Sequence, residues 1–405
     1  VTLRVEGADD LHPYPGLASF TEDDAEYFFG REAEVEQMWR KLEGPPRLLG
    51  LVGPSGAGKT SFLQAGLIPA ATAGWASVLC TPGTDPRASL RRAVISELEG
   101  DTEALRELAE GSDTASVTAV GRWRRHHQHA VVIVDQFEEL FTQNTADEQQ
   151  RFAALLGRLV VEADVFLVLS MRDDFLIYCN RHESLRPLFS ELTPLDPPTG
   201  AALRRALTQP ALQCGYRFEN DELVDGMLAE VEGERGALPL LAFAAARLWE
   251  KRDRDTGLLT RQTSEDIGGV GGALAKHAEA TVDGIGHERL PIVRELFRNL
   301  VTAEGTRAIR EWDDLLSVFP DSRSESGAAV LRGLIDARLL TSYEVREEDR
   351  EPTRRVEIIH ESLLANWPRL QRWMAQDAEG ALLRDQLRQA AKTWDEHDRS
   401  DDMLW

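Results

Sequence analysis

The stretch Leu48–Thr60 reads LLGLVGPSGAGKT, an apolar run of strand length that leads directly into a glycine-rich loop. Its second part, Gly53–Thr60, fits the pattern G-x-x-x-x-G-K-[ST], and a helical pattern follows over Ser61–Leu67. A strand, such a loop and a helix in this order are typical of a phosphate loop. The stretch therefore predicts a nucleotide-binding site in an α/β fold.

Each residue type in the loop has a chemical reason. Glycines allow the backbone to wrap around phosphates so that its N–H groups point inward. Lys59 brings positive charge to the β- and γ-phosphates, Thr60 offers a hydroxyl ligand for Mg²⁺, and the helix N-terminus adds its dipole. The loop residues that we expect to bind ATP or ADP are Gly53, Pro54, Ser55, Gly56, Ala57, Gly58, Lys59, Thr60 and Ser61.

A second apolar run, Ala130–Val134, ends in the acidic segment DQFEE at residues 135–139. A carboxylate at the end of such a strand lies beside the phosphate loop, so we expect Asp135 to hold Mg²⁺ through water. Glu138 and Glu139 follow within reach of an attacking water, which one of them would orient or deprotonate. The spacing does not decide between the two glutamates, and an ordinary acidic loop is the structural alternative.

A third run, Val165–Ser170, leads to Arg172 at the same edge of the predicted sheet, where ligands collect in α/β folds. Its guanidinium is a candidate catalytic group that senses the γ-phosphate. Pairing with Asp173 or Asp174 on the surface is the alternative, and the local sequence leaves both open.

From Leu48 to about Leu195, apolar runs alternate with helical patterns, which predicts a parallel sheet with helices on both faces. The predicted strands are Leu48–Val52, Val78–Cys80, Ala130–Val134 and Val165–Ser170. From Thr199 onward the pattern is helical, and a glycine-rich joint at residues 267–272 precedes a predicted helix Ala273–Val282.

The C-terminal part combines three short helical patterns with two β-like runs, which is typical of a winged helix. These five segments are Leu290–Val301, Ile309–Val318, Gly327–Ala337, Leu339–Val345 and Arg354–Ile359. The expected fold is thus an α/β P-loop NTPase core, a parallel sheet with helices on both faces, followed by an all-α lid and a winged-helix domain.

The same patterns divide the chain into five expected parts. They are a lead-in and adenine-flanking segment (residues 1–30), a P-loop nucleotide-binding domain (31–198), a helical lid (199–283), a winged-helix domain (284–374) and the start of a following helical segment (375–405). The chain begins at Val1 and stops at Trp405 in mid-pattern, so we expect it to be a piece of a larger protein.

Composition narrows the class of protein further. The net charge of −23, from 46 Lys+Arg against 69 Asp+Glu, argues against direct binding to nucleic acid or to an anionic membrane. No apolar run is long enough to cross a bilayer. The three cysteines, Cys80, Cys179 and Cys214, form neither a metal-binding pair nor an even framework, which fits a reducing cytoplasm.

Motifs along nearly the whole chain resemble the STAND class of P-loop NTPases, and most closely the novel bacterial STAND subfamily that is often fused to WD-repeat propellers and effector domains. The matching segments, in the family's order, are PYPGLASFTEDDAEYFFGRE (Pro13–Glu32), the phosphate loop, DQFEELF (Asp135–Phe141), GALPLLAFAAARLWE (Gly236–Glu250), IGGVGGALAKHAE (Ile267–Glu279) and VEIIHESLLANWPRL (Val356–Leu370).

The resemblance implies further contacts with the nucleotide. Phe29, Gly30 and Arg31 resemble the segment that lies beside adenine, and Pro239 resembles the lid proline that packs on the base. His360 resembles the winged-helix histidine that reaches the ADP phosphate and holds the resting state. Judged by its position alone, at the end of a β-like run, His360 would be a structural residue.

The resemblance also bears on the catalytic glutamate. Gln136 stands where many AAA+ relatives have theirs. The DxxEE spacing after the strand resembles instead the DxxDE pattern of NACHT-type members, which gives the role to Glu138 or Glu139.

In function, the resemblance implies a cytoplasmic signal-transducing switch in bacterial anti-phage defence or conflict signalling. ADP would hold a closed monomer. ATP would let the protein oligomerise with copies of itself and activate a fused effector, after sensor domains outside the chain respond to a trigger such as a phage protein. Slow ATP hydrolysis would serve the switching. Two alternatives stay open: a DNA-associated regulator or AAA+-like ATPase whose winged helix binds DNA, and a constitutive ATPase motor.

We expect the purified protein to retain an adenine nucleotide, mainly ADP, and the Lys59→Ala variant to lose it. The substitution removes the positive charge that pairs with the phosphates. Chromatography of the supernatant after denaturation measures the retained nucleotide. An empty wild-type protein that also fails to bind ATP with Mg²⁺ would contradict the predicted site.

Overall fold

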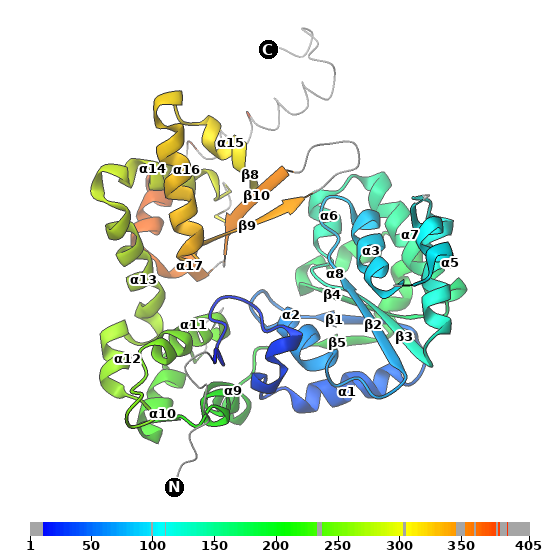
Figure 1. Ribbon diagram of the computed structural model, residues 1–405, viewed down its shortest axis with the longest axis horizontal. Helices are drawn as coiled ribbons and strands as arrows, with labels where there is room; N and C mark the ends of the chain where they lie inside the picture. Colours follow the sequence, from blue (N-terminus) through cyan, green and yellow to red (C-terminus); the bar gives the residue numbers. More distant parts are fainter. Residues whose placement is uncertain are drawn as a thin grey trace. The chain divides into compact units, whose positions relative to one another are not determined.

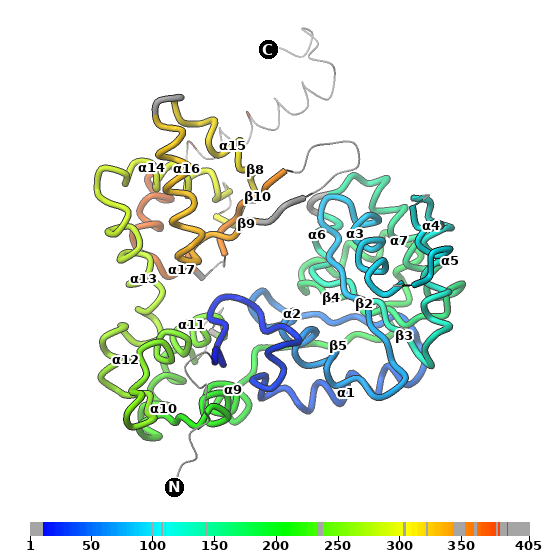
Figure 2. Tube along the Cα trace, in the orientation of Figure 1, coloured from blue at the N-terminus to red at the C-terminus, as the bar shows by residue number. Residues whose placement is uncertain are grey.

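The computed structural model describes residues 11–98, 100–109, 111–232, 237–302, 305–345, 353–359, 362–377, 380 and 387, which Figure 2 traces in colour. They form two compact units. Unit 1 holds the described residues of 1–15 and 19–218, and unit 2 holds those of 16–18 and 219–405. No helix among the described residues has both the length and the apolar character needed to cross a membrane.

Unit 1 is built on a five-stranded parallel sheet with the order β2-β3-β4-β1-β5 (Figure 1). Its strands are β1 (Leu48–Val52), β2 (Trp75–Cys80), β3 (His129–Val134), β4 (Phe166–Met171) and β5 (Leu192–Pro194). The predicted parallel sheet is confirmed, and the ends of its four predicted strands differ from the structure by three residues at most. The edge strand β5 was not predicted, because three residues are too few to show a period.

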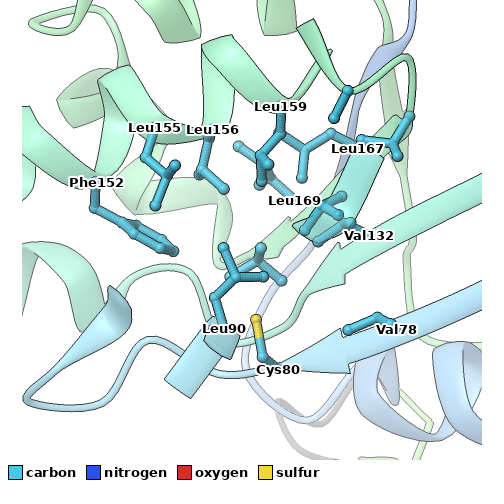
Figure 3. Close-up of a cluster of buried hydrophobic side chains, with 14 of the residues drawn as sticks. Val78, Cys80, Leu90, Val132, Phe152, Leu155, Leu156, Leu159, Leu167 and Leu169 are labelled. Carbon is cyan, nitrogen blue, oxygen red and sulfur yellow. The ribbon is translucent and has the colours of Figure 1, made fainter. Parts of the chain in front are cut away.

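Helices cover both faces of the sheet because side chains on each strand alternate between the faces. On one face, Val132 and Leu167 meet α7 (Ala146–Glu162) and α3 (Pro86–Ile95), as Figure 3 shows. On the other face, Leu49 and Leu51 pack with α1 (Glu32–Leu42) and with the helix after the phosphate loop. With both faces buried, β1, β3 and β4 are mostly apolar.

Most of the remaining elements of unit 1 are short. They are η2 (Glu22–Tyr27), α2 (Lys59–Ser61) with its π-helical continuation η3 (Phe62–Leu67), η4 (Ser96–Leu98), α4 (Thr102–Ala109), α5 (Asp113–Arg125), α6 (Glu139–Gln143), η5 (Asp173–Phe175), α8 (Leu176–Cys179), η6 (Glu183–Ser190), α9 (Gly200–Gln213) and β6 (Arg217–Phe218). The longest of them are helices α5 and α9. The basic tract at residues 122–129 ends α5 and begins β3. Its arginines Arg122 and Arg124 form ion pairs with Glu103 and Asp164.

Helix α9 carries an unusual insertion close to its C-terminal end. The hydroxyl of Tyr14 donates to the carbonyl oxygen of Leu207 (2.5 Å) and accepts from the N–H of Ala211 (3.2 Å). These two backbone groups would bond to each other in a regular helix. The Tyr14 hydroxyl therefore bridges two backbone groups of α9 in place of their direct hydrogen bond, next to Pro210.

Unit 2 begins with helices and ends with a small antiparallel sheet in the order β8-β10-β9. Its elements are α10 (Asp221–Ala229), α11 (Ala237–Glu250), β7 (Leu258–Leu259), α12 (Arg261–Ile267), α13 (Gly269–Ile285), η7 (His287–Arg289), α14 (Leu290–Asn299), β8 (Arg310–Glu311), α15 (Trp312–Ser317), α16 (Asp321–Asp336), β9 (Leu340–Val345), β10 (Thr353–Ile358) and α17 (Ser362–Asn366). The assignment of residues 284–374 to a winged helix remains a prediction.

Two predicted elements of unit 2 differ from the structure. The predicted helix Ile309–Val318 is wrong in its first part, because residues 310 and 311 pair with β10 as a strand and the helix begins only at Trp312. The predicted joint at residues 267–272 is mostly helical. The carboxylate of Glu230 accepts the N–H groups of Val270 and Gly271, so α13 can begin four residues earlier than Ala273.

We expect Tyr14→Phe to loosen helix α9, because the Leu207 carbonyl and the Ala211 N–H lose a buried partner at a cost of about 1–3 kcal/mol. Hydrogen exchange of peptides covering residues 200–213 measures the effect, which should be an acceleration of about tenfold for each 1.4 kcal/mol. The control is Tyr178→Phe, which keeps the ring that stacks on Phe141. Unchanged exchange in α9 would show that the hydroxyl does not stabilise it.

Candidate nucleotide-binding site

The phosphate loop leaves the C-terminal end of β1 and enters α2 (Figure 1). Gly56 and Gly58 have φ angles of +77° and +85°, in the left-handed region that favours glycine. Gly53 is needed for a different reason. A Cβ atom there would lie 2.2 Å from the carbonyl oxygen of Leu195, just after β5. Backbone geometry thus requires glycine at three positions of the predicted loop.

Lys59 lies across the mouth of the loop. Its Nζ donates to the carbonyl oxygens of Gly53 (2.8 Å) and Pro54 (3.0 Å). Burial lowers the pKa of this ammonium, although the carboxylates of Glu138 and Asp135 act in the opposite direction. The ammonium is therefore a partly desolvated charge that neutral carbonyls compensate only in part.

The two predicted magnesium ligands contact each other. Thr60 Oγ1 donates to Asp135 Oδ2 at 2.7 Å, and Asp135 is only 1% exposed. The second carboxylate oxygen, Oδ1, is buried and accepts no hydrogen bond from the part of the chain that the structure describes. A buried anionic oxygen without a donor is costly unless a cation or a cation-bound water compensates it. The residues present thus fit Mg²⁺, a hard cation that takes few protein oxygens and keeps several waters.

Glu138 and Glu139 have different surroundings. Glu138 Oε2 accepts the N–H of Arg172 at 3.3 Å, and burial raises the pKa of its carboxyl group against the opposing charge of Lys59. Glu139 Oε2 accepts the N–H of Gly83 at 3.0 Å, so it holds the loop that follows β2. The pKa shifts of Lys59 and Glu138 show that Glu138 is electrostatically coupled to Lys59 and to Asp135.

A sharp turn after β3 explains why the side chains of Asp135 and Gln136 point in different directions. Gln136 has a φ angle of +51°, which is strained for a residue with a side chain, and it is exposed. The next residue, Phe137, is fully buried, and its N–H donates to the carbonyl oxygen of Ser170 at 2.8 Å. The turn carries the Gln136 side chain outward, away from the buried carboxylate that precedes it.

The end of β4 supplies one more polar group. Ser170 is fully buried, and its hydroxyl has no hydrogen-bond partner among the described residues. The register pairs Val134 with Leu169, so Ser170, near the end of β4, lies at the level where Asp135 follows β3. Its place at this sheet edge was predicted, but no role was assigned to it, because a serine at the end of an apolar run has no distinctive spacing.

Arg172 forms the surface pair that was the structural alternative. Its guanidinium donates to Asp174 at 3.0 and 2.8 Å, and it lies 5.5 Å from the centre of the Phe175 ring. Its backbone N–H donates to the carboxylate of Glu138.

The three residues expected beside adenine precede α1. Phe29 is partly buried, and Gly30 has a φ angle of +88° and leaves no room for a Cβ, which would lie 2.3 Å from the carbonyl oxygen of Ala202. Arg31 is 6% exposed and reaches the phosphate loop, where its Nη2 donates to the carbonyl oxygen of Ala57 at 3.0 Å.

The two remaining predicted contacts come from elsewhere in the chain. Pro239 lies in the first turn of α11 in unit 2. His360 lies outside the described residues, as does Gly236 at the start of the matching segment Gly236–Glu250. The predicted roles of Pro239 and His360 therefore remain predictions.

A parallel sheet in this order, a phosphate loop after the interior strand β1 and a buried aspartate after β3 define a P-loop NTPase. The chain belongs to the family described as Novel STAND NTPase 1, whose model matches residues 13–402. The match confirms the resemblance to STAND-class NTPases. Membership of this family of P-loop NTPases implies that the chain binds a nucleotide.

Solved structures and curated proteins add less. The chain is similar to the Walker-type ATPase PABY2304 of Pyrococcus abyssi, with 16% identity, a TM-score of 0.48 and coverage of 86% of this chain and 97% of that chain. It is also similar to the Aeropyrum pernix ORC1 protein in complex with DNA, with 17% identity, a TM-score of 0.44 and coverage of 89% and 96%. Likeness at this level does not identify an activity. A search of curated proteins found no significant match.

We expect Glu138→Gln to abolish ATP hydrolysis and keep ATP binding, whereas Glu139→Gln keeps most of the turnover. The reason is that Glu138 couples to Lys59 and Asp135, while Glu139 is engaged by Gly83. Phosphate release and equilibrium binding of labelled ATP are the measurements. Loss of hydrolysis only in Glu139→Gln, or only in Gln136→Ala, would assign the role to that residue instead.

The raised pKa of the Glu138 carboxyl group predicts that ATP hydrolysis depends on pH. A base must be ionised, so hydrolysis should fall on acidification at a pH above the ordinary glutamate value of 4.5, because burial raises the pKa. Ionisation of Glu138 has the opposite effect on folding stability. A folded-state pKa above the unfolded one means that ionisation of Glu138 costs stability as pH rises through this window. Glu138→Gln should therefore raise the melting temperature at neutral pH and leave it unchanged at pH 4.

Proposed function

We propose that the protein is an ATP/ADP-dependent molecular switch that hydrolyses ATP slowly. The observation that carries the proposal is the hydrogen bond of Thr60 to the buried Asp135, whose Oδ1 accepts no hydrogen bond from the described residues, at the sheet edge that also holds Lys59 and Glu138. These are the groups that hydrolysis of a phosphoanhydride requires, and they come from two separate segments of the chain.

The chemistry follows from what each side chain can supply. Lys59 exchanges the loop carbonyls for phosphate oxygens, which carry a full charge and bind its ammonium more strongly. Thr60 and Asp135 would hold Mg²⁺, which when bound offsets charge on the phosphate oxygens. Glu138 would take the proton of the attacking water, and its raised pKa makes it a better base than an exposed carboxylate.

Slow turnover is consistent with the state of Arg172. In the structure its guanidinium is committed to Asp174, so contact with a γ-phosphate requires it to exchange partners. A partly exposed ion pair of this kind contributes only about 0–1 kcal/mol, so the exchange is feasible when a stronger anion is present. We propose that Arg172 joins the site only when ATP is bound.

The switching role rests on membership of the STAND family and on a thermodynamic requirement. A nucleotide can shift a population only if it binds two states with different affinity. In the proposed cycle ADP stabilises a closed monomer, with Pro239 on the base and His360 on the phosphate. ATP stabilises an open form that associates with other copies and activates a fused effector in the cytoplasm. A role in bacterial anti-phage defence, with a phage protein as trigger, follows from the family resemblance.

Association driven by ATP is the direct test. We expect Glu138→Gln, which should hold ATP without hydrolysing it, to form oligomers with ATP and Mg²⁺ and to be monomeric with ADP. We expect His360→Ala to favour the associated form, by about ten- to a hundredfold if it loses a hydrogen bond to a charged group. Size-exclusion chromatography with light scattering gives the mass.

Lys59→Ala is the control, because without nucleotide it should have one mass under every condition. An unchanged mass of Glu138→Gln with ADP and with ATP would contradict the switch. Binding of labelled duplex DNA by the monomer, weakening steeply with salt, would favour the alternative of a DNA-associated regulator.

A further inference from the structure

The segment Ser19–Glu32, called the strap here, lies against the phosphate-loop region at several points. The N–H of Phe20 donates to Ser61 Oγ at 3.1 Å, directly after the loop. Phe28 packs on Gly66 of η3 so closely that a Cβ at Gly66 would lie 2.8 Å from its ring. These contacts fix the strap to the helix that begins in the phosphate loop.

Arg31 makes the most specific contact of the strap. One nitrogen of its guanidinium, Nη2, donates to the carbonyl oxygens of Ala57 (3.0 Å) and Asp196 (2.6 Å), and Nη1 donates to Glu34 at 2.9 Å. Ala57 is in the phosphate loop, and Asp196 follows β5 on the way to α9. One buried cation thus joins two backbone segments far apart in the sequence.

The strap reaches α9 as well. Gly30 touches the first turn of α9 at the carbonyl oxygen of Ala202, and Glu32 forms an ion pair with Arg205 one turn later. The carboxylate of Glu32 also accepts the N–H of Gly30, so it fixes the residue just before Arg31. Residues on both sides of Arg31 therefore hold α9, while Arg31 itself holds the phosphate loop.

We propose that Arg31 is a positioning residue for the phosphate loop, and that through it phosphate binding and the segment from Asp196 to α9 are coupled. The role rests on the proposed nucleotide site, yet it differs from a contact with adenine. Because both acceptors are backbone carbonyls, the guanidinium senses where the loop backbone lies. Phosphates that draw the loop N–H groups inward would move Ala57, and the shared guanidinium transmits that displacement to Asp196.

Lysine is the informative replacement at this position. It keeps the positive charge, but its single ammonium on a flexible stem cannot reproduce a planar fork that serves Ala57, Asp196 and Glu34 together. Arg31→Gln is the second variant, since its amide can keep one carbonyl contact without a buried charge. Arg40→Lys in helix α1, which begins directly after Arg31, is the matched control, because Arg40 is exposed and pairs only with Glu36 in the described contacts.

The first measurement is hydrogen exchange in the nucleotide-free protein. We expect Arg31→Lys and Arg31→Gln to accelerate exchange about tenfold or more in peptides covering residues 53–60 and 200–213, and Arg40→Lys to change neither. Peptides of β3 serve as the internal reference for global stability. Equal acceleration in β3 would mean a merely structural role, and no acceleration in residues 53–60 would overturn the proposal.

The second measurement distinguishes a role of Arg31 in positioning the phosphate loop from a contact with the adenine base. Competition against a fluorescent ADP analogue gives affinities for ADP and for inorganic tripolyphosphate, both with Mg²⁺. We expect Arg31→Lys to weaken both by the same factor, about tenfold. Weakening of ADP alone would make Arg31 an adenine contact and overturn the positioning role. A wild-type protein that binds no nucleotide would refute the proposed function itself, whatever the variants do.

Discussion

The buried carboxylate of Asp135 is the constraint on which the rest of the site depends. At 1% exposure, an anionic oxygen must be paired, and among the described residues only the Thr60 hydroxyl donates to the carboxylate, at one of its two oxygens. The pair exists because β3 and β1 deliver their ends to one edge of the sheet, separated by β4. The price of burying Asp135 is thus offset fully only when a cation joins the site, which ties the stability of this edge to its ligand.

The site must bind a negatively charged nucleotide although the chain as a whole is negatively charged. A net charge of −23 repels a polyanion at long range, so any binding of nucleotide must come from short-range groups. The phosphate loop offers inward N–H groups, the Lys59 ammonium and a helix N-terminus within a few ångströms, where screening by salt is weak. Asp135 and Glu138 add repulsion in the same place, and Mg²⁺ is the ligand that turns Asp135 from an opposing charge into a binding group.

The sequence predicts the parts of this site that depend on local pattern, and it leaves open those that depend on contacts between distant segments. Strand β1, the phosphate loop and the aspartate after β3 follow from apolar runs and motif spacing. The choice between Glu138 and Glu139 depends on their different partners, Arg172 and Gly83, which are 34 and 56 residues away in the sequence. Strand β5 is too short to show a period, and the carbonyl partners of Arg31 are 26 and 165 residues away.

Arg31 shows that a residue expected beside a ligand can also be held by the backbone of its own chain. The family resemblance places Gly30 and Arg31 beside adenine, and that contact stays a prediction. In the structure, Gly30 is required by the approach of Ala202, and Arg31 is occupied by two carbonyl oxygens of the backbone. Because these acceptors belong to the backbone, the contact survives any side-chain change at Ala57 or Asp196 that keeps the fold. It responds only to displacement of the chain, which is the quantity that phosphate binding changes.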